Sequence, residues 1–362
     1  MLNASAFFVS LKHRDRVAFR PSIESTLVAP ERKILGRLSG FKESYARVMK
    51  KILFRAVVIF VSMVPFPLLA DAMAPVVTNQ WLAGHLGEKG LSVIEMSNEA
   101  SFEFDGHIPG AVFTEKSFWR REDTDGALVR LPDRVLERRI RELGVNESDR
   151  VVIYYKGDNL NEVLGAYYLY WLFHYLGHTN VAMLERGWPG WLAAGAPIET
   201  NSVNAKPGNF VARPLPSLAI TTDELYAIHG NYTVIDGRPA ANFAGRAKFP
   251  SNTRYGRIPG STSQPWADYL GKDKDGRIFI DAAMTPPLLK NGMISKKEPL
   301  LLTCFGGTGA AITYTLFYNQ GYRNMRLNDA GLRRWNARFL PLKRDPGPPP
   351  GKPAADGKRV DY

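Results

Sequence analysis

Hydrophobic and polar positions form two kinds of apolar segment between Ala74 and Leu342. Short apolar runs with β-branched residues, such as 151–155 and 300–303, are typical of buried strands. Longer apolar runs that end near Gly177 and Gly321 are typical of helices. Strands that alternate with helices predict a parallel sheet covered on both faces, so we expect an α/β fold.

The same order of segments occurs twice along the chain. Each copy has a strand, a polar loop that ends in Gly-x-Ile-Pro-Gly, a second strand, an apolar helix, a third strand and a segment with tryptophan. The Gly-x-Ile-Pro-Gly loops are residues 106–110 and 256–260. Between the copies lies a stretch rich in Pro, Asn and Gly, which suits a linker.

These patterns predict how the chain is divided. We expect a tail with too little apolar surface to fold, because its sequence is DPGPPPGKPAADGKRVDY. The expected parts are an N-terminal extension with a signal at 1–72, a first domain at 74–200, a linker at 201–217, a second domain at 218–343 and a disordered tail at 344–362.

Positive charge is concentrated at the front of the chain. The net charge is +12, and residues 1–72 carry 12 Lys and Arg against 5 Asp and Glu, which accounts for +7 of it. The other basic residues form no run that follows a phosphate backbone, and no nucleic-acid motif occurs, so nucleic acid is not an expected partner. A basic start at Met49, an apolar stretch to Leu69 and the small residues of 70–72 predict a secretory signal peptide at about 49–72.

This signal predicts export to the periplasm, with a mature protein that begins near Met73. Translation then starts at Met1 or at Met49, and the basic, patternless 1–48 favours Met49. The alternative is an uncleaved anchor in the inner membrane that faces the periplasm. The stretch is short for a span, which needs about 20 apolar residues, and prolines interrupt it. We expect a monomer, because two fused domains reduce the need for dimerisation.

Cys304 is the one cysteine of the chain, so it is either a small buried hydrophobe or a reactive thiol. It follows a predicted strand and precedes a loop and a predicted helix. The loop consists of Phe305, Gly306, Gly307, Thr308 and Gly309. Its glycines allow successive N–H groups to point at one place, and the helix start adds positive potential there. We expect this cradle to lower the pKa of the thiol and stabilise a thiolate.

Several further motifs accompany the Cys304 loop: DGHIPGA, LGHTNVAMLERGWPGWLAAGAPI, VIDGRPAANFAGR and GRIPGS. Their order, duplication and spacing resemble a tandem-domain rhodanese of the exported bacterial type. This sulfurtransferase family includes thiosulfate and 3-mercaptopyruvate sulfurtransferases. The resemblance implies two rhodanese-like domains, each a mainly parallel five-stranded sheet with helices on both faces.

The resemblance also implies a mechanism that uses neither metal nor organic cofactor. Cys304 takes a sulfane sulfur from an anionic donor, thiosulfate or 3-mercaptopyruvate, and its persulfide passes the sulfur to cyanide or a thiol. Arg238 stands where the family commonly places a substrate-binding arginine, and Arg246 is a second candidate for that role. The alternatives are a structural ion pair for Arg238 and a solvated loop charge for Arg246.

The first copy lacks this chemistry, because its strand leads into KGDNLNEV without a thiol or a glycine cluster. We therefore expect 74–200 to be non-catalytic and to shape the cleft, with Lys156 as an alternative source of charge there. The Cys304 loop departs from the family patterns Cys-Arg-Lys-Gly-Val-Thr and Cys-Gly-Ser/Ala-Gly-Val-Thr. The sulfur donor therefore does not follow from the sequence, and a larger donor or a protein-borne persulfide remains an alternative.

Other functions fit the residues less well. A Cys-x5-Arg phosphatase needs an arginine where Ala310 stands. A thiol–disulfide oxidoreductase needs a second cysteine. The scattered His107, His178 and His229 indicate structural roles and no metal site. The competing hypothesis is a non-catalytic rhodanese-like protein that binds or senses sulfur anions.

The signal peptide makes a testable prediction. N-terminal sequencing of the exported protein is expected to start near Met73, because cleavage follows the small residues 70–72. A cytoplasmic protein whose sequence begins at Met1 would contradict export.

Overall fold

The computed structural model describes residues 73–201, 205–249, 254–290 and 294–346. The predicted signal peptide and most of the predicted disordered tail therefore lie outside the described residues. No helix within the described ranges is both long and apolar enough to cross a membrane.

The first domain is built on a five-stranded sheet in which every neighbouring pair is parallel. The strands, in spatial order, are β1 (Val76–Val77), β7 (Val181–Leu184), β6 (Arg150–Tyr155), β2 (Leu91–Met96) and β3 (Val112–Thr114). Its helices are α2 (Asn79–His85), α3 (Glu99–Phe104), α4 (Asp133–Glu142), α5 (Leu160–Tyr175) and α6 (Gly187–Ala193).

The second domain repeats this plan with the same strand order and again only parallel pairs. Its strands, in the matching order, are β8 (Ala219–Ile220), β14 (Met325–Asn328), β13 (Leu300–Thr303), β9 (Thr233–Asp236) and β10 (Thr262–Ser263). Its helices are α7 (Thr222–Ile228), α8 (Ala240–Phe243), α9 (Pro287–Lys290), α10 (Thr308–Asn319) and α11 (Gly331–Ala337).

Each domain also has a small antiparallel pair, and four 3-10 turns occur among the described residues, one in the first domain, one where the linker meets the second domain and two within the second domain. The pairs are β4 (Arg120–Glu122) with β5 (Leu128–Arg130), and β11 (Leu270–Lys272) with β12 (Ile278–Ile280). The 3-10 turns are η1 (Lys116–Trp119), η2 (Pro216–Leu218), η3 (His229–Asn231) and η4 (Trp266–Tyr269).

Helices cover both faces of each sheet, as predicted. In the first sheet, alternate residues of β6 belong to different cores: Ile153 packs with α5, whereas Tyr154 packs with α2, α3 and α6. In the second sheet, Leu302 packs with α10, and Leu301 packs with α7 and α11. This alternation is what a parallel strand buried on both faces requires. The expected α/β fold with two rhodanese-like sheets is confirmed.

The Gly-x-Ile-Pro-Gly loop of each domain is held in place by an isolated β-bridge at the equivalent position. His107 forms an isolated antiparallel bridge with Glu199, and Arg257 forms one with Lys343. Each bridge ties a Gly-x-Ile-Pro-Gly loop to the end of its own domain. The linker also bonds along the first domain, where the N–H of Phe210 donates to the Val145 carbonyl at 3.2 Å.

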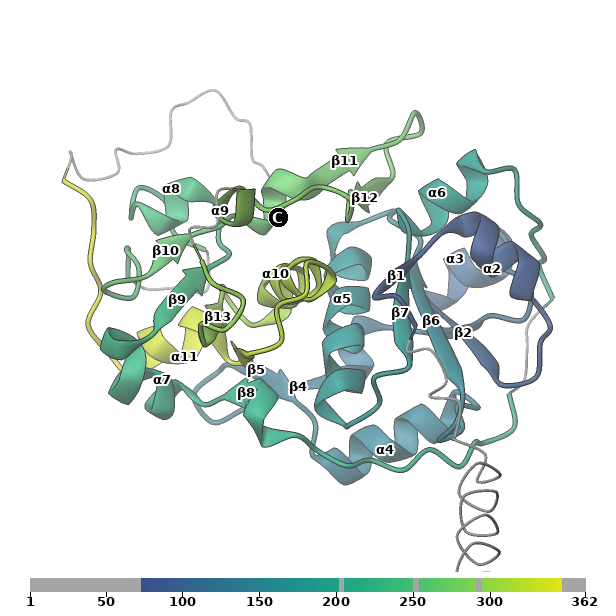
Figure 1. Ribbon diagram of the computed structural model, residues 1–362, viewed down its shortest axis with the longest axis horizontal. Helices are drawn as coiled ribbons and strands as arrows, with labels where there is room; N and C mark the ends of the chain where they lie inside the picture. The colour runs from purple at the N-terminus through teal and green to yellow at the C-terminus, as the bar shows by residue number, and fades with distance from the viewer. Residues whose placement is uncertain (1–72, 202–204, 250–253, 291–293, 347–362) are drawn as a thin grey trace, which may run out of the picture. The chain divides into compact units, whose positions relative to one another are not determined.

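Helices α5 and α10 join the two domains. They lie side by side in the centre of Figure 1, and they make more contacts with each other than either makes with any strand. Nearly every side chain of both helices is buried, which explains why both are apolar on all sides. One hydrophobic core therefore runs through both domains.

A buried histidine lies within this helix pair. His174 of α5 is 1 % exposed, and its Nδ1 lies 2.9 Å from the Tyr314 hydroxyl of α10. Burial, with smaller effects from Arg323 and His178, lowers the pKa of His174 to about 3. The folded protein therefore holds this histidine neutral, whereas the unfolded chain binds a proton below about pH 6.5.

This difference predicts acid destabilisation. Between pH 6.5 and 5 the His174 pKa shift is expected to cost up to about 1.4 kcal/mol of unfolding free energy per pH unit. Denaturant unfolding at pH 7 and pH 5 should show a smaller loss for His174→Gln than for the wild type. Equal losses in His174→Gln and the wild type would contradict this account.

Candidate active site

Cys304 lies at the carboxyl end of the second sheet, between β13 and α10. Its side chain is 2 % exposed. The Cys304 carbonyl accepts the Leu332 N–H at 2.9 Å, and the next carbonyl, of Phe305, accepts the Arg333 N–H at 3.0 Å. These bonds hold the Cys304 loop against the start of α11.

Two glycines allow the close approaches in this loop. Gly307 has φ +86°, and a Cβ there would lie 2.3 Å from the Asp329 carbonyl oxygen. A Cβ on Gly309 would lie 2.3 Å from Nε1 of Trp266. Any larger residue at either position would therefore displace the loop or the indole.

The predicted cradle is present, since the N–H groups of Ala310, Gly306 and Gly307 bond to the thiol. The expected decrease in the pKa is nevertheless wrong. Burial raises the pKa of the Cys304 thiol above its usual value, because desolvation outweighs the three N–H groups, and Asp236 acts in the same direction as burial. The resting thiol is thus held protonated, and the cradle is poised for a sulfur anion.

The thiol lines a cavity of about 150 Å³ whose walls come from both domains. The first domain contributes Lys116, Arg120 and Asn161 together with three leucines. In the second domain, Arg333 adds a third cation, and the Phe305 ring packs at a tilt against the Phe249 ring with centroids 4.6 Å apart. No carboxylate occurs among the described residues of the lining, although Arg120 pairs with Asp329 behind it at 3.6 Å, so the lining itself carries net positive charge.

The two arginines chosen from the sequence do not supply this charge. Arg238 is 2 % exposed and pairs with Asp236, with Nη2 to Oδ2 at 2.6 Å, while it also donates to the Gly256 carbonyl at 3.0 Å. Arg238 therefore forms the structural ion pair that the sequence analysis gave as the alternative to substrate binding. Arg246 is exposed and lies outside the cavity lining, which matches the alternative of a solvated loop charge.

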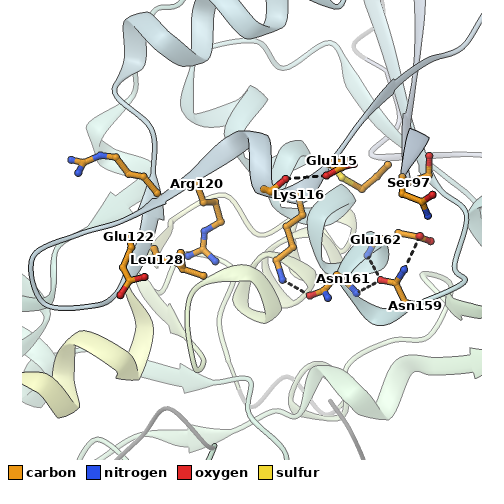
Figure 2. Close-up of a pocket in the computed structure, with 13 residues that line it drawn as sticks. Ser97, Glu115, Lys116, Arg120, Glu122, Leu128, Asn159, Asn161 and Glu162 are labelled. Atoms are coloured by element: carbon orange, nitrogen blue, oxygen red, sulfur yellow. Dashed lines mark hydrogen bonds between the residues drawn. The ribbon is translucent and has the colours of Figure 1, made fainter. Parts of the chain in front are cut away.

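Lys116 in η1 was not identified from the sequence. Its Nζ donates to Asn161 Oδ1 at 2.7 Å, as Figure 2 shows. Burial, followed by the charge of Arg120, lowers the pKa of Lys116 to about 8, whereas Cys304 acts in the opposite direction. Lys116 is therefore charged at neutral pH and loses its charge near the upper end of the physiological range.

Arg120 joins the first domain to the Cys304 loop. Its Nη2 donates to the Gly306 carbonyl at 2.5 Å and to the Asp329 carbonyl at 3.2 Å. Its guanidinium also lies over the Tyr168 ring, 4.7 Å from the centroid. These contacts make the first domain part of the structure that holds the thiol.

The corresponding loop of the first domain, 156–159, has the same length but different contacts. Glu162 Oε2 accepts the N–H groups of Gly157 and Asp158 at 3.0 Å each, so a carboxylate takes the bonds that the thiol receives in the second domain. Lys156, at the position of the thiol, is buried, donates to the Gly106 carbonyl and lies 4.0 Å from Glu95. Lys156 does not line the Cys304 cavity, and it does not line a second, larger cavity that shares Lys116 and Arg120 with it. The alternative that Lys156 charges the cleft therefore finds no support in the geometry.

The histidines take structural positions. His107 is fully buried and stacks on Phe102 with centroids 4.0 Å apart. His178 packs on Phe173 and Phe210, and Nδ1 of His229 lies 2.8 Å from the Tyr226 carbonyl.

Comparisons with known proteins agree with this architecture. The model of the rhodanese-like domain matches residues 78–194 and 221–338. The chain belongs to the rhodanese-like family and contains two such domains.

Among curated proteins, the chain is 28 % identical over 278 residues to a 3-mercaptopyruvate sulfurtransferase of Escherichia coli K12, covering 73 % of this chain and 95 % of the relative. It is 29 % identical over 297 residues to a thiosulfate sulfurtransferase of Corynebacterium glutamicum, covering 75 % and 91 %. Among solved structures, SseA from Escherichia coli superposes with a TM-score of 0.59 at 23 % identity, covering 72 % of this chain and 99 % of that one. The anaerobic ergothioneine biosynthesis enzyme from Chlorobium limicola gives 0.62 at 20 % identity, covering 76 % and 72 %. At these identities the two structures show the fold.

The different surroundings of Arg238 and Lys116 make a testable prediction. Arg238→Ala leaves the buried Asp236 carboxylate without its partner, so unfolding free energy should fall by about 3–5 kcal/mol. Lys116→Met should change stability by less than about 1 kcal/mol. If thiosulfate is a donor, as the resemblance implies, Lys116→Met should instead raise its KM roughly 10- to 100-fold, because a charged contact is lost.

Lys116→Arg serves as the matched control. It keeps the charge, so the KM should stay low and the loss of thiosulfate affinity above about pH 8 should move to higher pH. The assignment fails if Arg238→Ala raises the KM without loss of stability while Lys116→Met leaves the KM unchanged.

Proposed function

We propose that the protein is a sulfurtransferase that moves a sulfane sulfur from a small anionic donor, through a persulfide on Cys304, to cyanide or a thiol. Its enzyme class is the one that the curated relatives carry in their names. The observation that carries the proposal is a lone thiol that faces three N–H donors in a cavity with three cations. This arrangement suits an anionic sulfur species at both stages of a two-step transfer.

In the first step the Cys304 thiol gives its proton to solvent, and the resulting thiolate attacks the outer sulfur of the donor. A bond forms between Sγ and that sulfur, and the bond that held it in the donor breaks. Thiosulfate then leaves as sulfite with the bonding electron pair, and 3-mercaptopyruvate leaves as the enolate of pyruvate, which takes up a proton. The three N–H groups at Sγ then stabilise the persulfide anion, and the cations hold the anionic leaving group.

In the second step the acceptor attacks the terminal sulfur of the persulfide. Cyanide becomes thiocyanate or a thiol becomes a persulfide, and the electron pair of the broken S–S bond returns to Cys304. No outside oxidant or reductant is required. Because the transfer is split in two, ping-pong kinetics are expected.

Cavity size restricts the donor. A volume of about 150 Å³ is comparable to that of engineered cavities that hold a molecule of six carbons. Thiosulfate and 3-mercaptopyruvate are of this size. We therefore favour a small donor over the larger ones that the sequence left open.

The competing function is a rhodanese-like protein that binds a sulfur anion without turnover. The raised pKa of Cys304 favours it, because a protonated thiol is a poor nucleophile. We further propose that the protein acts in the periplasm as a monomer. The location rests on the signal peptide predicted from the sequence, and the monomer rests on the two fused domains.

Persulfide formation distinguishes the enzyme from the binding protein. Incubation with thiosulfate or 3-mercaptopyruvate should increase the mass of the wild type by one sulfur atom. Cyanide should then remove that sulfur as thiocyanate, and Cys304→Ser should show no adduct. Absence of an adduct with every anionic donor tried would favour the binding protein.

A further inference from the structure

A second and larger cavity of about 660 Å³ adjoins the Cys304 cavity. The two share Lys116, Arg120, Leu128 and Asn161 as a common wall. We call the larger cavity the trough, and Figure 2 shows its lining, from Glu122 and Arg120 past Lys116 to Asn159 and Ser97. A molecule in the trough can thus approach the thiol across this shared wall.

The trough lies at the carboxyl edge of the first sheet. Ser97 and Asn98 follow β2, Glu115 follows β3, and Asn159 lies in the loop after β6. Ligands of parallel α/β sheets bind at this edge. The first domain has no thiol, and Glu162 accepts its loop N–H groups, but a cleft is present at the strand ends.

The two ends of the trough differ in chemistry. The end shared with the Cys304 cavity carries the cations Lys116 and Arg120, with the Glu122 carboxylate beside them. The far end is lined by Ser97 and Asn159, and Asn98 also lines the trough. The side-chain oxygens of Asn98 and Asn159 accept N–H groups of Ser101 and Asn161 at 2.9 Å each, so they also cap the helices that begin there. The Glu115 carboxylate, also in the lining, accepts a bond from Ser117 Oγ at 3.1 Å and has no ion pair with any described residue. These groups suit a ligand with carboxylate, amide and ammonium groups, as a short peptide has.

The size of the trough also suits a ligand as large as a short peptide. Its volume lies within the range of about 300–1,000 Å³ that is usual for small-molecule sites, and it far exceeds what cyanide or thiosulfate fills. A small donor therefore has its own cavity beside the thiol. The trough is left for the other substrate of a two-step transfer.

We propose that the trough binds the sulfur acceptor, a short cysteine-containing peptide whose thiol reaches Cys304 across the shared wall. This inference rests on the proposed sulfur transfer. The acceptor thiolate attacks the terminal sulfur of the Cys304 persulfide, an S–S bond forms in the peptide, and the S–S bond to Cys304 breaks. The first domain thereby becomes the acceptor-binding half of the enzyme.

The test measures the second step alone, with full-length protein first converted to the persulfide by thiosulfate. The probes are glutathione as the peptide thiol, 2-mercaptoethanol as a small uncharged thiol, and cyanide. Ser117→Trp places an indole in the trough, because Ser117 is exposed and lies in its lining. The matched control is Ser217→Trp, since Ser217 is also an exposed serine in a 3-10 turn but lines neither the trough nor the Cys304 cavity.

In Ser117→Trp the ratio of the second-order rate constant for glutathione to that for cyanide should fall roughly tenfold or more. Glu115→Gln should lower the rate constant for glutathione relative to that for 2-mercaptoethanol several-fold, because it removes a charge that the small thiol does not use. Ser217→Trp should keep both ratios.

Two results would overturn the trough as an acceptor site: unchanged ratios in both trough variants, or an equal loss for glutathione and cyanide. If the wild type forms no persulfide, the proposed sulfur transfer fails instead. The mass of the protein before acceptor is added separates these two failures.

Discussion

The packing of α5 against α10 determines what surrounds the thiol. Both helices are buried on nearly all sides, so separating the domains would expose a large apolar surface to water at a high cost in free energy. The same packing brings η1 and β4 of the first domain to the Cys304 loop, where Arg120 bonds to the Gly306 carbonyl. The first domain thereby supplies two of the three cations of the cavity, although it has no thiol of its own.

The same strand-to-helix loop surrounds a thiol in the second domain and a carboxylate in the first. Both loops end a strand and begin a buried helix, and both direct backbone N–H groups to one place. In the second domain that place holds a sulfur, and in the first it holds the Glu162 carboxylate. Burial raises the pKa of Glu162 to about 7, which reflects how far this carboxylate is removed from water. A side chain from the loop's own helix thus takes the position that an anionic substrate would otherwise need.

The fold could be predicted from the sequence because its signals are local and duplicated. The strand at 300–303, the glycines that follow the central helices and the paired Gly-x-Ile-Pro-Gly loops each depend on a few neighbouring residues. The position of Cys304 followed from the same signals. The prediction of a lowered thiol pKa was wrong because it counted N–H donors without the cost of burial, which only the packed structure reveals.

The cations of the site could not be found in the same way. Lys116 lies 188 residues before Cys304 in the sequence, and the two share a cavity only because α5 packs on α10. Arg238 follows a strand at the expected place, but Asp236 two residues earlier already binds its guanidinium. A carboxylate at that spacing is a local signal for an ion pair, so this alternative could have been preferred from the sequence.

The central claim is that a charge from the first domain acts on the thiol of the second. Lys116 and Cys304 line the same cavity, so a charged Lys116 is expected to favour the thiolate over the neutral thiol. The most direct measurement is the rate of Cys304 alkylation by iodoacetamide across pH, which gives the apparent pKa of the thiol. The account predicts a higher apparent pKa in Lys116→Met than in the wild type. An identical pKa in the two proteins would contradict it.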